Sequence, residues 1–424
     1  MSSKQEDQAA VFSKLFNQLP DSKFAKPQLS GNIEPEIDLP AAFKATLDAP
    51  EFYPPLSDSV FPGDSVAIVL QSNIPHPRKV LDALLYRLAS VNVAVSDILV
   101  VITRRTADQL QLDPVMFTSV EDNKPEGTRP VIFPVEFEFN TINFQVHDPE
   151  NQTGHAYLAA SAEADPIHVN RCVVDADVVL PVGCPRPGEA NQQGDCIYPD
   201  FSNESTIQRF SQGKGSFISR WQEIELANDA LGAFFSIQIV CGPGDSIRQV
   251  YSGARKDAVN SARAATNELW SLDWNAKTDV VVATIESNPG EQNWDDFSNA
   301  LVASSSVAKS DGPIVIWSEI GLTPDRNTRK ACMSQFDDVI SAKLPKKLQH
   351  VAAIVSDRPV FLRSRLSRNV VEELGLGFVE SAEEIVRIAE PHSTGLVIRD
   401  AHKCQIRTEV ESNTGQDQSI EEME

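Results

Sequence analysis

Short apolar runs separated by helical patterns constrain the fold of this 424-residue chain more than any other feature. The runs are DSVAIVL, DILVVI, DVVVATI and PIVIWS, at Asp64–Leu70, Asp97–Ile102, Asp279–Ile285 and Pro313–Ser318. Continuous Val and Ile runs of this kind are typical of parallel strands that are covered on both faces. The stretch Val80–Ser90 between the first two runs has apolar residues at helical spacing. The order strand, helix, strand therefore predicts an α/β protein.

The chain length and the order of these elements predict two α/β domains with a cleft between them. We expect an N-terminal domain over residues 39–272 and a C-terminal domain over residues 273–410. An Ala-rich helix at Lys256–Trp270 is expected to link them. Residues 1–38 are polar, which predicts an arm with one short helix near Ala10–Leu19. The polar, acidic residues 411–424 are expected to be disordered.

Further elements follow from apolar periodicity. Strands are predicted at Arg129–Phe139, Asp177–Val182, Ala233–Cys241, Val351–Val355 and Leu396–Arg399. Helices are predicted at Glu223–Leu231, Phe336–Leu344 and Arg368–Leu374, and Ile167–Asp175 is expected to lead by a short helix into the strand at Asp177–Val182. Residues 143–165 are predicted to form a loop and hairpin. The sequence GPGD at Gly242–Asp245 predicts a tight turn. It is not a phosphate loop, because it lacks the GxxxxGK[ST] and GxGxxG patterns.

The charge and composition of the chain argue against some classes of binding partner. The chain has 60 acidic and 37 basic residues, for a formal net charge of −23. This balance argues against nucleic acid or an anionic membrane as a partner. No stretch approaches the ~20 apolar residues of a membrane span, and the chain begins without the apolar run of a signal peptide. The six cysteines match no common zinc spacing, so we expect reduced thiols in a cytoplasmic protein.

The stretch Arg171–Asp200, RCVVDADVVLPVGCPRPGEANQQGDCIYPD, holds the most informative loop. It predicts a strand at Asp177–Val182 followed by a long segment rich in Gly, Pro, Asn and Gln. In an open α/β sheet, ligands bind in the crevice outside the carboxyl ends of the strands. We therefore expect the ligand site at the loop that begins after Val182.

Four segments carry a resemblance to the nickel-dependent lactate racemase family. They are Ile167–Gly183, with the sequence IHVNRCVVDADVVLPVG, then Gly244–Ala265, Asp279–Ala300 and Glu372–Ala389. Their order and spacing extend the resemblance from about Asp64 to Glu409. It implies the two-domain α/β fold of that family and a racemase or epimerase activity on a 2-hydroxy acid. It also implies a nickel-pincer nucleotide bound to a lysine through a thioamide, with histidine bases at the substrate.

The positions that match the family's site carry other residue types. Ile74 lies where the family has an arginine, and Arg104 lies at the place of one catalytic histidine. Arg186 stands where the other histidine would be, and Asp195 falls at the lysine position. The metal-binding histidine maps to Ser211. The Gln and Lys that the family has in the second domain map to Asp296 and Asn299.

These replacements bear directly on the chemistry. Arginine does not act as a base near neutral pH, and an aspartate cannot supply the covalent amine. Residues 183–211 contain no lysine or histidine at all. One hypothesis is a relative without racemase activity that binds a small anionic molecule, a carboxylate or a phosphate. The alternative is an active racemase or epimerase on another hydroxy acid, with a non-covalent or altered nickel cofactor.

Two further groups are candidate sites. Arg104, Arg105 and Arg186 follow predicted strand ends and either bind an anion together or form salt bridges with nearby carboxylates. The pattern of His147, Asp148 and His155 allows a metal site, and equally a turn beside the site. The ligand-binding candidates are therefore Asn73, His76, Arg104, Arg105, Arg186, Asp195, Ser211, Asp296 and Asn299.

Overall fold

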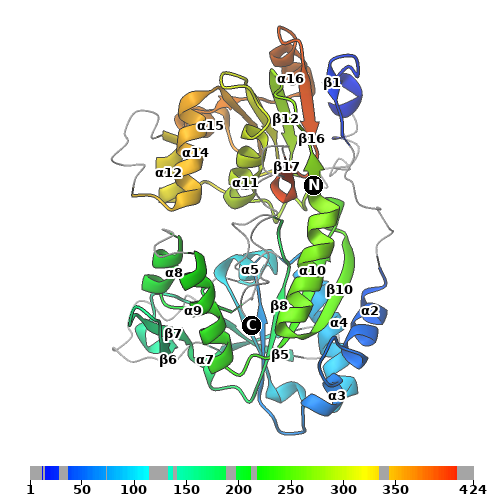
Figure 1. Ribbon diagram of the computed structural model, residues 1–424, viewed down its shortest axis with the longest axis vertical. Coiled ribbons are helices and arrows are strands. Elements are labelled where there is room, and N and C mark those ends of the chain that lie inside the picture. The colour runs from blue at the N-terminus through cyan, green and yellow to red at the C-terminus, as the bar shows by residue number, and fades with distance from the viewer. Residues whose placement is uncertain are drawn as a thin grey trace. The chain divides into compact units, whose positions relative to one another are not determined.

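The computed structural model describes residue 12 and residues 15–27, 37–72, 74–113, 132–136, 141–187, 197–211, 217–333 and 343–407. The chain divides into two compact units (Figure 1). We call residues 33–267 the N-terminal unit, and residues 1–32 with 268–424 the C-terminal unit. The boundary between them falls within one long helix, α10 (Arg255–Trp270).

A seven-stranded sheet forms the centre of the N-terminal unit, in the order β10-β9-β8-β2-β3-β5-β4. The strands are β2 (Val66–Leu70), β3 (Ile98–Ile102), β4 (Ile132–Glu136), β5 (Thr141–Val146), β8 (Val178–Gly183), β9 (Phe235–Cys241) and β10 (Ile247–Ala254). The five inner strands are parallel, while β4 and β10 pair antiparallel at the two edges. A separate antiparallel pair, β6 (His155–Ala160) and β7 (Pro166–Asn170), lies outside this sheet.

Helices cover both faces of this sheet, as the continuous apolar strands require. Alternate residues of β2, namely Val66, Ile68 and Leu70, pack in a core with α2 (Leu39–Asp48) and α4 (Pro77–Ser90). Val69 faces the opposite core, which includes residues of α7 (Arg171–Val174) and α9 (Phe217–Ala230). The short helices α3 (Leu56–Ser59), α5 (Arg104–Gln109) and α8 (Glu204–Ser211) complete the unit. The α/β prediction is thereby confirmed for this unit.

The C-terminal unit contains a second sheet, in which all six strands are parallel, in the order β1-β16-β12-β13-β14-β15. Its strands are β1 (Phe24–Ala25), β12 (Val280–Thr284), β13 (Ile314–Trp317), β14 (Val360–Arg363), β15 (Gly377–Phe378) and β16 (Gly395–Ile398). One face packs against α11 (Trp294–Ser305) and α14 (Lys346–Asp357). The other face packs against α16 (Ala382–Ala389). The remaining helices are α12 (Arg326–Met333) and α15 (Arg368–Glu373), and β11 (Ser271–Asp273) pairs with β17 (Gln405–Arg407).

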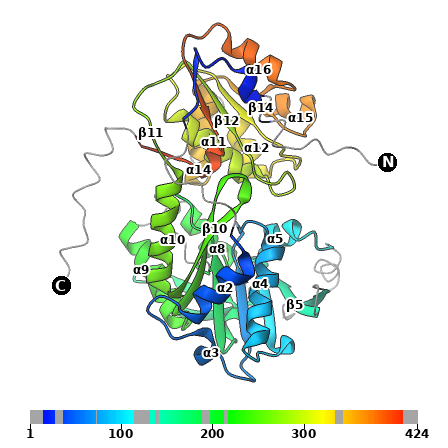
Figure 2. The same cartoon turned by 90° about the vertical axis from the view of Figure 1, so that its right-hand side faces the viewer.

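The N-terminal segment belongs to the core of the C-terminal unit, which differs from the polar arm expected for residues 1–38. Phe12, Leu15, Leu19 and Phe24 are all buried against that sheet. Figure 1 labels β1 near β16, the strand with which it pairs in parallel, and Figure 2 shows the same unit turned by 90°. Phe12, Leu15, Phe16 and Leu19 recur at helical spacing, so the sequence indicated one apolar helix face but not the sheet on which it packs.

Two secondary-structure predictions are wrong. Val351–Val355, predicted as a strand, lies within α14, because its residues continue a helical face that includes Leu348 and packs on the sheet. The strand of this region is β14, which follows α14. Residues 143–146, expected in a loop, instead belong to β5 in the parallel sheet. The short helix expected within Ile167–Asp175 is confirmed as α7, which follows β7. Most of the helix predicted at Phe336–Leu344 and the whole tail 411–424 lie outside the described residues.

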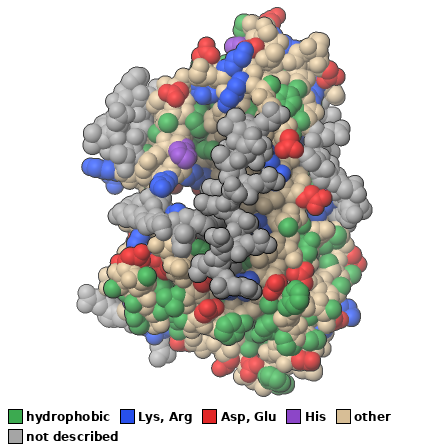
Figure 3. Space-filling view, viewed as in Figure 1, with side chains coloured by type: hydrophobic (Ala, Val, Ile, Leu, Met, Phe, Trp, Pro, Cys, Tyr) green, Lys and Arg blue, Asp and Glu red, His purple; other side chains and the backbone are tan. Residues whose placement is uncertain are grey.

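The distribution of acidic side chains and the length of the helices can be compared with the expectations from composition. Figure 3 shows acidic side chains spread over the visible face of the molecule rather than gathered in one place. Among the helices that the structure describes, none is long and apolar enough to cross a membrane.

The packing of Phe24 on Gly395 offers a test of the N-terminal segment's place. A Cβ added at Gly395 would lie 2.3 Å from Cε1 of Phe24, so Gly395→Ala should lower the free energy of unfolding by about 1–3 kcal/mol. Phe24→Ala alone should cost about 3–5 kcal/mol. In the Phe24→Ala background the clash is gone, and Gly395→Ala should then cost little. Urea unfolding of the single and double variants measures this coupling.

Gly321→Ala provides the control, because the nearest atom to its added Cβ is 3.8 Å away, in Arg365. It should change stability by less than about 1 kcal/mol. Additive effects of Phe24→Ala and Gly395→Ala would contradict this packing.

Candidate functional site

The carboxyl edge of the N-terminal unit's sheet has a topological switch point between β2 and β8. From β2 the chain passes through α4 to β3 on one side, and from β8 it passes through α8 and α9 to β9 on the other. The loops that leave these two strands therefore diverge, and a crevice at such a point is where open α/β sheets bind ligands. The loop after β8 is the one that the sequence predicted as the site.

Hydrogen bonds hold the loops after β2 and β8 together. The Gln71 backbone N–H donates to the Val182 carbonyl at 3.1 Å. The side-chain Oε1 of Gln71 accepts from the Cys184 N–H at 3.3 Å. Both loops thus begin side by side at the switch point.

A second link joins the loop after β2 to the loop after β3. The hydroxyls of Ser72 and Thr103 lie 2.7 Å apart. Thr103 also caps α5, since its Oγ1 accepts from the Thr106 N–H at 3.3 Å. The start of α5 is therefore fixed to the same edge as the loop after β2.

The three arginines predicted from the sequence as candidate anion ligands follow strands that end at this edge. Arg104 and Arg105 are the first two residues of α5, directly after β3, and Arg186 lies three residues beyond the end of β8. Because β3 and β8 both flank β2, their ends are about 10 Å apart, twice the spacing of neighbouring strands. The Arg104 side chain is 52% exposed and lies 3.7 Å from Asp108, one helical turn further on. Arg105 and Arg186 are half-buried.

The other candidates on this sheet have separate positions. His76 caps α4 in a left-handed backbone conformation, with φ of 47°. Ser211 is the last residue of α8. Asn73 and Asp195 lie outside the described residues.

His147, immediately after β5, is buried in a hydrogen-bonded cluster. Its Nε2 lies 2.9 Å from the Ser202 carbonyl, to which it donates, and its Nδ1 lies 3.1 Å from Nδ2 of Asn170. The same Asn170 amide donates to Oε1 of Gln145 at 2.9 Å. An amide that gives one hydrogen to each neighbour requires an unprotonated Nδ1, so this arrangement fixes the neutral Nε2–H tautomer. Burial, with the adjacent His155, lowers the pKa of His147 to about 3.

His155 and Asp148 complete the group that the sequence offered as a metal site. The ring of His155 meets that of His147 edge to face at 5.3 Å, and its Nδ1 lies 2.8 Å from the Asn151 carbonyl. Asp148 accepts from the Glu150 N–H in a local turn. Within the described residues, no group of three His, Cys, Asp or Glu side chains could hold a metal ion. The geometry therefore favours the turn beside the site.

The long loop after β8 returns to the core at a buried ionic network. Tyr198 is 1% exposed, and its hydroxyl donates to the carboxylate of Glu223 on α9. Arg209 of α8 binds both oxygens of the same carboxylate, with one N–O distance of 2.7 Å. Burial and this carboxylate raise the pKa of Tyr198. Tyr198 thus fixes the end of the loop to α8 and α9.

Asp296 and Asn299 lie on α11 in the C-terminal unit, where Asp296 has a structural role. Its Oδ2 accepts from the Asn293 backbone N–H at 3.2 Å, while the Asn293 side chain accepts from the backbone of Asp296. This reciprocal pair is a capping box at the start of the helix. Asn299 is half-buried on the same helix.

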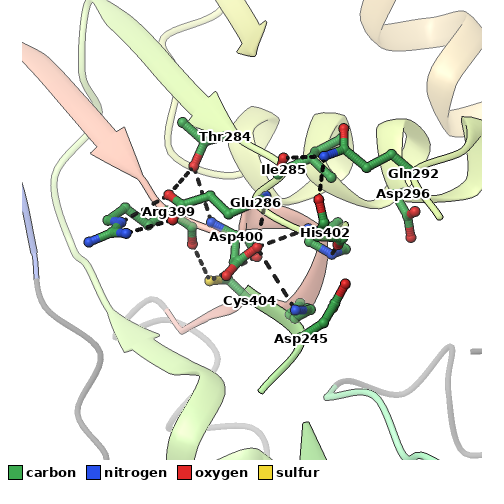
Figure 4. Close-up of polar contacts among 12 residues, drawn as sticks. Asp245, Thr284, Ile285, Glu286, Gln292, Asp296, Arg399, Asp400, His402 and Cys404 are labelled. Atoms are coloured by element: carbon green, nitrogen blue, oxygen red, sulfur yellow. Dashed lines mark hydrogen bonds and ion pairs between the residues drawn. The ribbon is translucent and has the colours of Figure 1, made fainter. Parts of the chain in front are cut away.

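The carboxyl edge of the second sheet carries a polar cluster that sequence reasoning missed (Figure 4). Here too a switch point occurs, because β12 leads through α11 to β13 on one side and pairs with β16 on the other. Glu286 follows β12 and receives a two-pronged contact from Arg399, which follows β16, with an Nε–Oε1 distance of 2.9 Å. The Glu286 N–H donates to Oδ1 of Asp400 at 2.9 Å.

Ser287, His402 and Lys403 complete the cluster. Ser287 Oγ and His402 Nε2 are 2.8 Å apart, and His402 Nδ1 lies 3.9 Å from Asp400 Oδ1. Lys403 Nζ lies 3.9 Å from the same oxygen and 5.4 Å from the ring centre of Trp270. The only signal in the sequence was the presence of polar residues directly after two apolar strands, which also describes an ordinary loop.

Solved structures with the same fold include the lactate racemase apoprotein of Thermoanaerobacterium thermosaccharolyticum. It matches with a TM-score of 0.65 and 16% sequence identity, over 92% of this chain and 96% of that chain. A crystal structure of a protein from Thermotoga maritima matches with a TM-score of 0.57 and 13% identity, over 90% and 100% of the two chains. No protein-family model matches the sequence, and no curated protein matches it either. At these identities the likeness establishes the lactate-racemase-like α/β fold, and the activity does not follow from it.

The buried neutral His147 should make stability depend on pH. Its pKa in the folded protein is lowered to about 3 from a reference value near 6.5, so the unfolded chain binds a proton that the folded protein excludes. The stabilisation is therefore complete above pH 6.5 and is lost as the pH falls toward 3. Between pH 7.5 and 4.5, this group should remove about 2–3 kcal/mol of unfolding free energy.

Urea unfolding of the wild type and His147→Gln at several pH values measures this contribution. The variant should be less stable at pH 7.5 but lose less stability on acidification. The exposed His350→Gln should follow the wild type. Identical pH slopes for the wild type and His147→Gln would show that His147 is not held neutral by the fold.

Proposed function

We propose that this protein is a divergent relative of lactate racemases that does not racemise by the nickel-pincer route, and that it binds a small anion. The ligand would be a carboxylate or a phosphate, held at the carboxyl edge of the N-terminal unit's sheet. The observation that carries the proposal is the position of three arginines at this edge. Arg104 and Arg105 follow β3 and Arg186 follows β8, the two strands that flank β2. The shared fold supports the relationship.

The residue types at the matched positions do not fit the nickel-pincer cofactor. A thioamide link requires an amine, and residues 183–211 contain no lysine. The same segment contains no histidine to bind the metal. Arg104, at the position of a catalytic base, keeps its proton at any physiological pH. His147, buried directly after β5, already uses both ring nitrogens in hydrogen bonds within the protein.

The same replacements favour anion binding. A guanidinium group presents a planar fork of donors that matches a carboxylate or phosphate, and it retains its charge. At a switch point the loops leave room for a ligand between them. Ser72 and Thr103 place hydroxyl groups at the same edge, and hydroxyls can donate to anionic oxygens. The site thus combines cations with neutral hydrogen-bond donors.

Calorimetric titration with L-lactate, D-lactate and inorganic phosphate tests the proposal. At least one of these anions should bind to the wild type. Arg104→Gln and Arg186→Gln should each weaken that binding by about tenfold or more, because each removes a charged hydrogen-bond donor. Arg105→Gln should weaken it as well.

Arg368→Gln is a closely matched control. Arg368 begins a six-residue helix, as Arg104 does, and pairs with Glu372 one turn later at 3.3 Å. Its side chain is 53% exposed. This variant should bind the anion as the wild type does. Failure of all three anions to bind, or equal affinity in the Arg104, Arg186 and Arg368 variants, would refute the proposed site.

A further inference from the structure

The polar cluster of the second sheet contains an ordered array of Ser287, His402 and Asp400. Ser287 is the third residue after β12, and the other two lie after β16, so the array spans the switch point. Figure 4 labels Asp400 and His402. The Ser287 hydroxyl is 2.8 Å from Nε2 of His402. On the far side of the ring, Nδ1 lies 3.9 Å from Asp400. Hydroxyl, imidazole and carboxylate thus follow one another in the order that activates a serine nucleophile.

Backbone geometry fixes the carboxylate end of the array. Asp400 adopts a left-handed conformation, with φ of 47°, which is uncommon for a residue other than Gly. Its N–H donates to Thr284 Oγ1 at 3.3 Å, and its Oδ1 accepts from the Glu286 N–H at 2.9 Å. Such a conformation in a buried residue persists only where the surroundings determine it, and it occurs often at functional sites.

Hydrogen bonds from Gln292 fix the loop at the serine end of the array. Gln292 donates through Nε2 to the carbonyls of Ile285 and Ser287, at 2.9 and 2.6 Å. Its Oε1 accepts from the Glu319 N–H, which ties this loop to the end of β13. The loop that carries Ser287 is therefore anchored on both sides of the serine.

The charges in the cluster suit proton transfer from serine to histidine. Lys403 Nζ lies 3.9 Å from Asp400, and the lysine is 1% exposed, so its charge favours an ionised carboxylate in this buried setting. An ionised Asp400 in turn stabilises the imidazolium that forms when His402 accepts the serine proton.

Ser287 is nearly buried, and it lies next to an exposed stretch of its own loop. Ser287 is 5% exposed, while Asn288 and Gly290, next along the chain, are exposed. A Cβ built on Gly290 meets no atom within 4 Å, so open space borders the loop at that point. The loop thus reaches the surface within three residues of the serine, and a small acyl group is the substrate class that suits so nearly buried a hydroxyl.

We propose that Ser287 is a nucleophile toward small esters, with His402 as its base and Asp400 as the group that orients the base. In the acylation step, His402 takes the Ser287 proton as Oγ bonds to the acyl carbon, and the ester C–O bond breaks. The leaving alcohol takes the proton from His402. Water then hydrolyses the acyl-serine, with His402 again accepting and returning a proton. This centre is independent of the anion site proposed for the N-terminal unit.

Ser318, after the neighbouring strand β13, shows the contacts of a serine hydroxyl with a structural role at the same edge of the sheet. Ser318 directly follows β13, is fully buried, and donates its hydroxyl to the Arg363 carbonyl at 2.9 Å. A carbonyl cannot accept the proton of a serine during catalysis, whereas an imidazole can. Ser318 is therefore a matched control for Ser287.

Labelling with a small fluorophosphonate distinguishes the two serines. The reagent phosphonylates an activated serine with release of fluoride, and intact mass with peptide mapping locates the adduct. The full-length wild type and Ser318→Ala should be labelled at Ser287 to a stoichiometry near one, and Ser287→Ala should not be labelled. The wild type should also hydrolyse p-nitrophenyl acetate at least tenfold faster than Ser287→Ala.

His402→Gln should lose the same labelling, with its folding checked by thermal unfolding. If this buried variant does not fold, the comparison of Ser287→Ala with Ser318→Ala decides alone, because each removes a single hydroxyl. No adduct on the wild type, an adduct on another residue, or equal esterase rates in the two serine variants would overturn the proposal.

Discussion

The parallel pairing of one strand with neighbours on both sides is the constraint on which the structure depends. In the N-terminal unit β2 pairs with β3 and β8, and in the C-terminal unit β12 pairs with β13 and β16. Parallel strands end on the same edge, so loops that are far apart in the sequence begin next to each other. Both polar sites described above follow from this arrangement, one on each sheet.

The fold could be predicted where burial alone decides the structure. The runs around Ile68, Val100 and Val282 are apolar on both faces, and only a covered parallel sheet buries them fully. Prediction failed where a local pattern was ambiguous. The segment containing Val351 has β-branched residues and also a helical apolar face, and packing against the sheet selected the helix. Nothing local showed that Phe24 would add a strand to β16, because that pairing joins residues more than 350 positions apart.

The candidate sites were predictable to different degrees. Arg104 and Arg186 could be located because each follows an apolar strand, and position after a strand indicates the ligand-binding edge. Their contacts with one another and with a ligand depend on side-chain conformation, which spacing does not specify. The pair of Ser287 and His402 was not found, since 115 residues separate them and only the folded sheet brings them together.

The lactate-racemase-like fold and the chemistry of this chain are separate questions. A fold can be retained while the residues that carry its reaction change, since the core and the site place different demands on the sequence. Here the strands and switch points are present, whereas residues 183–211, after β8, contain no lysine or histidine. Tyr198, near the middle of that segment, instead anchors it through Glu223 on α9.

Intact-mass and metal analysis of protein made together with the enzymes that synthesise the nickel-pincer cofactor tests the central claim most directly. The account predicts the mass of the unmodified polypeptide and no stoichiometric nickel, because residues 183–211 offer no amine for the thioamide link. A covalent mass increase together with one nickel ion per chain would contradict it.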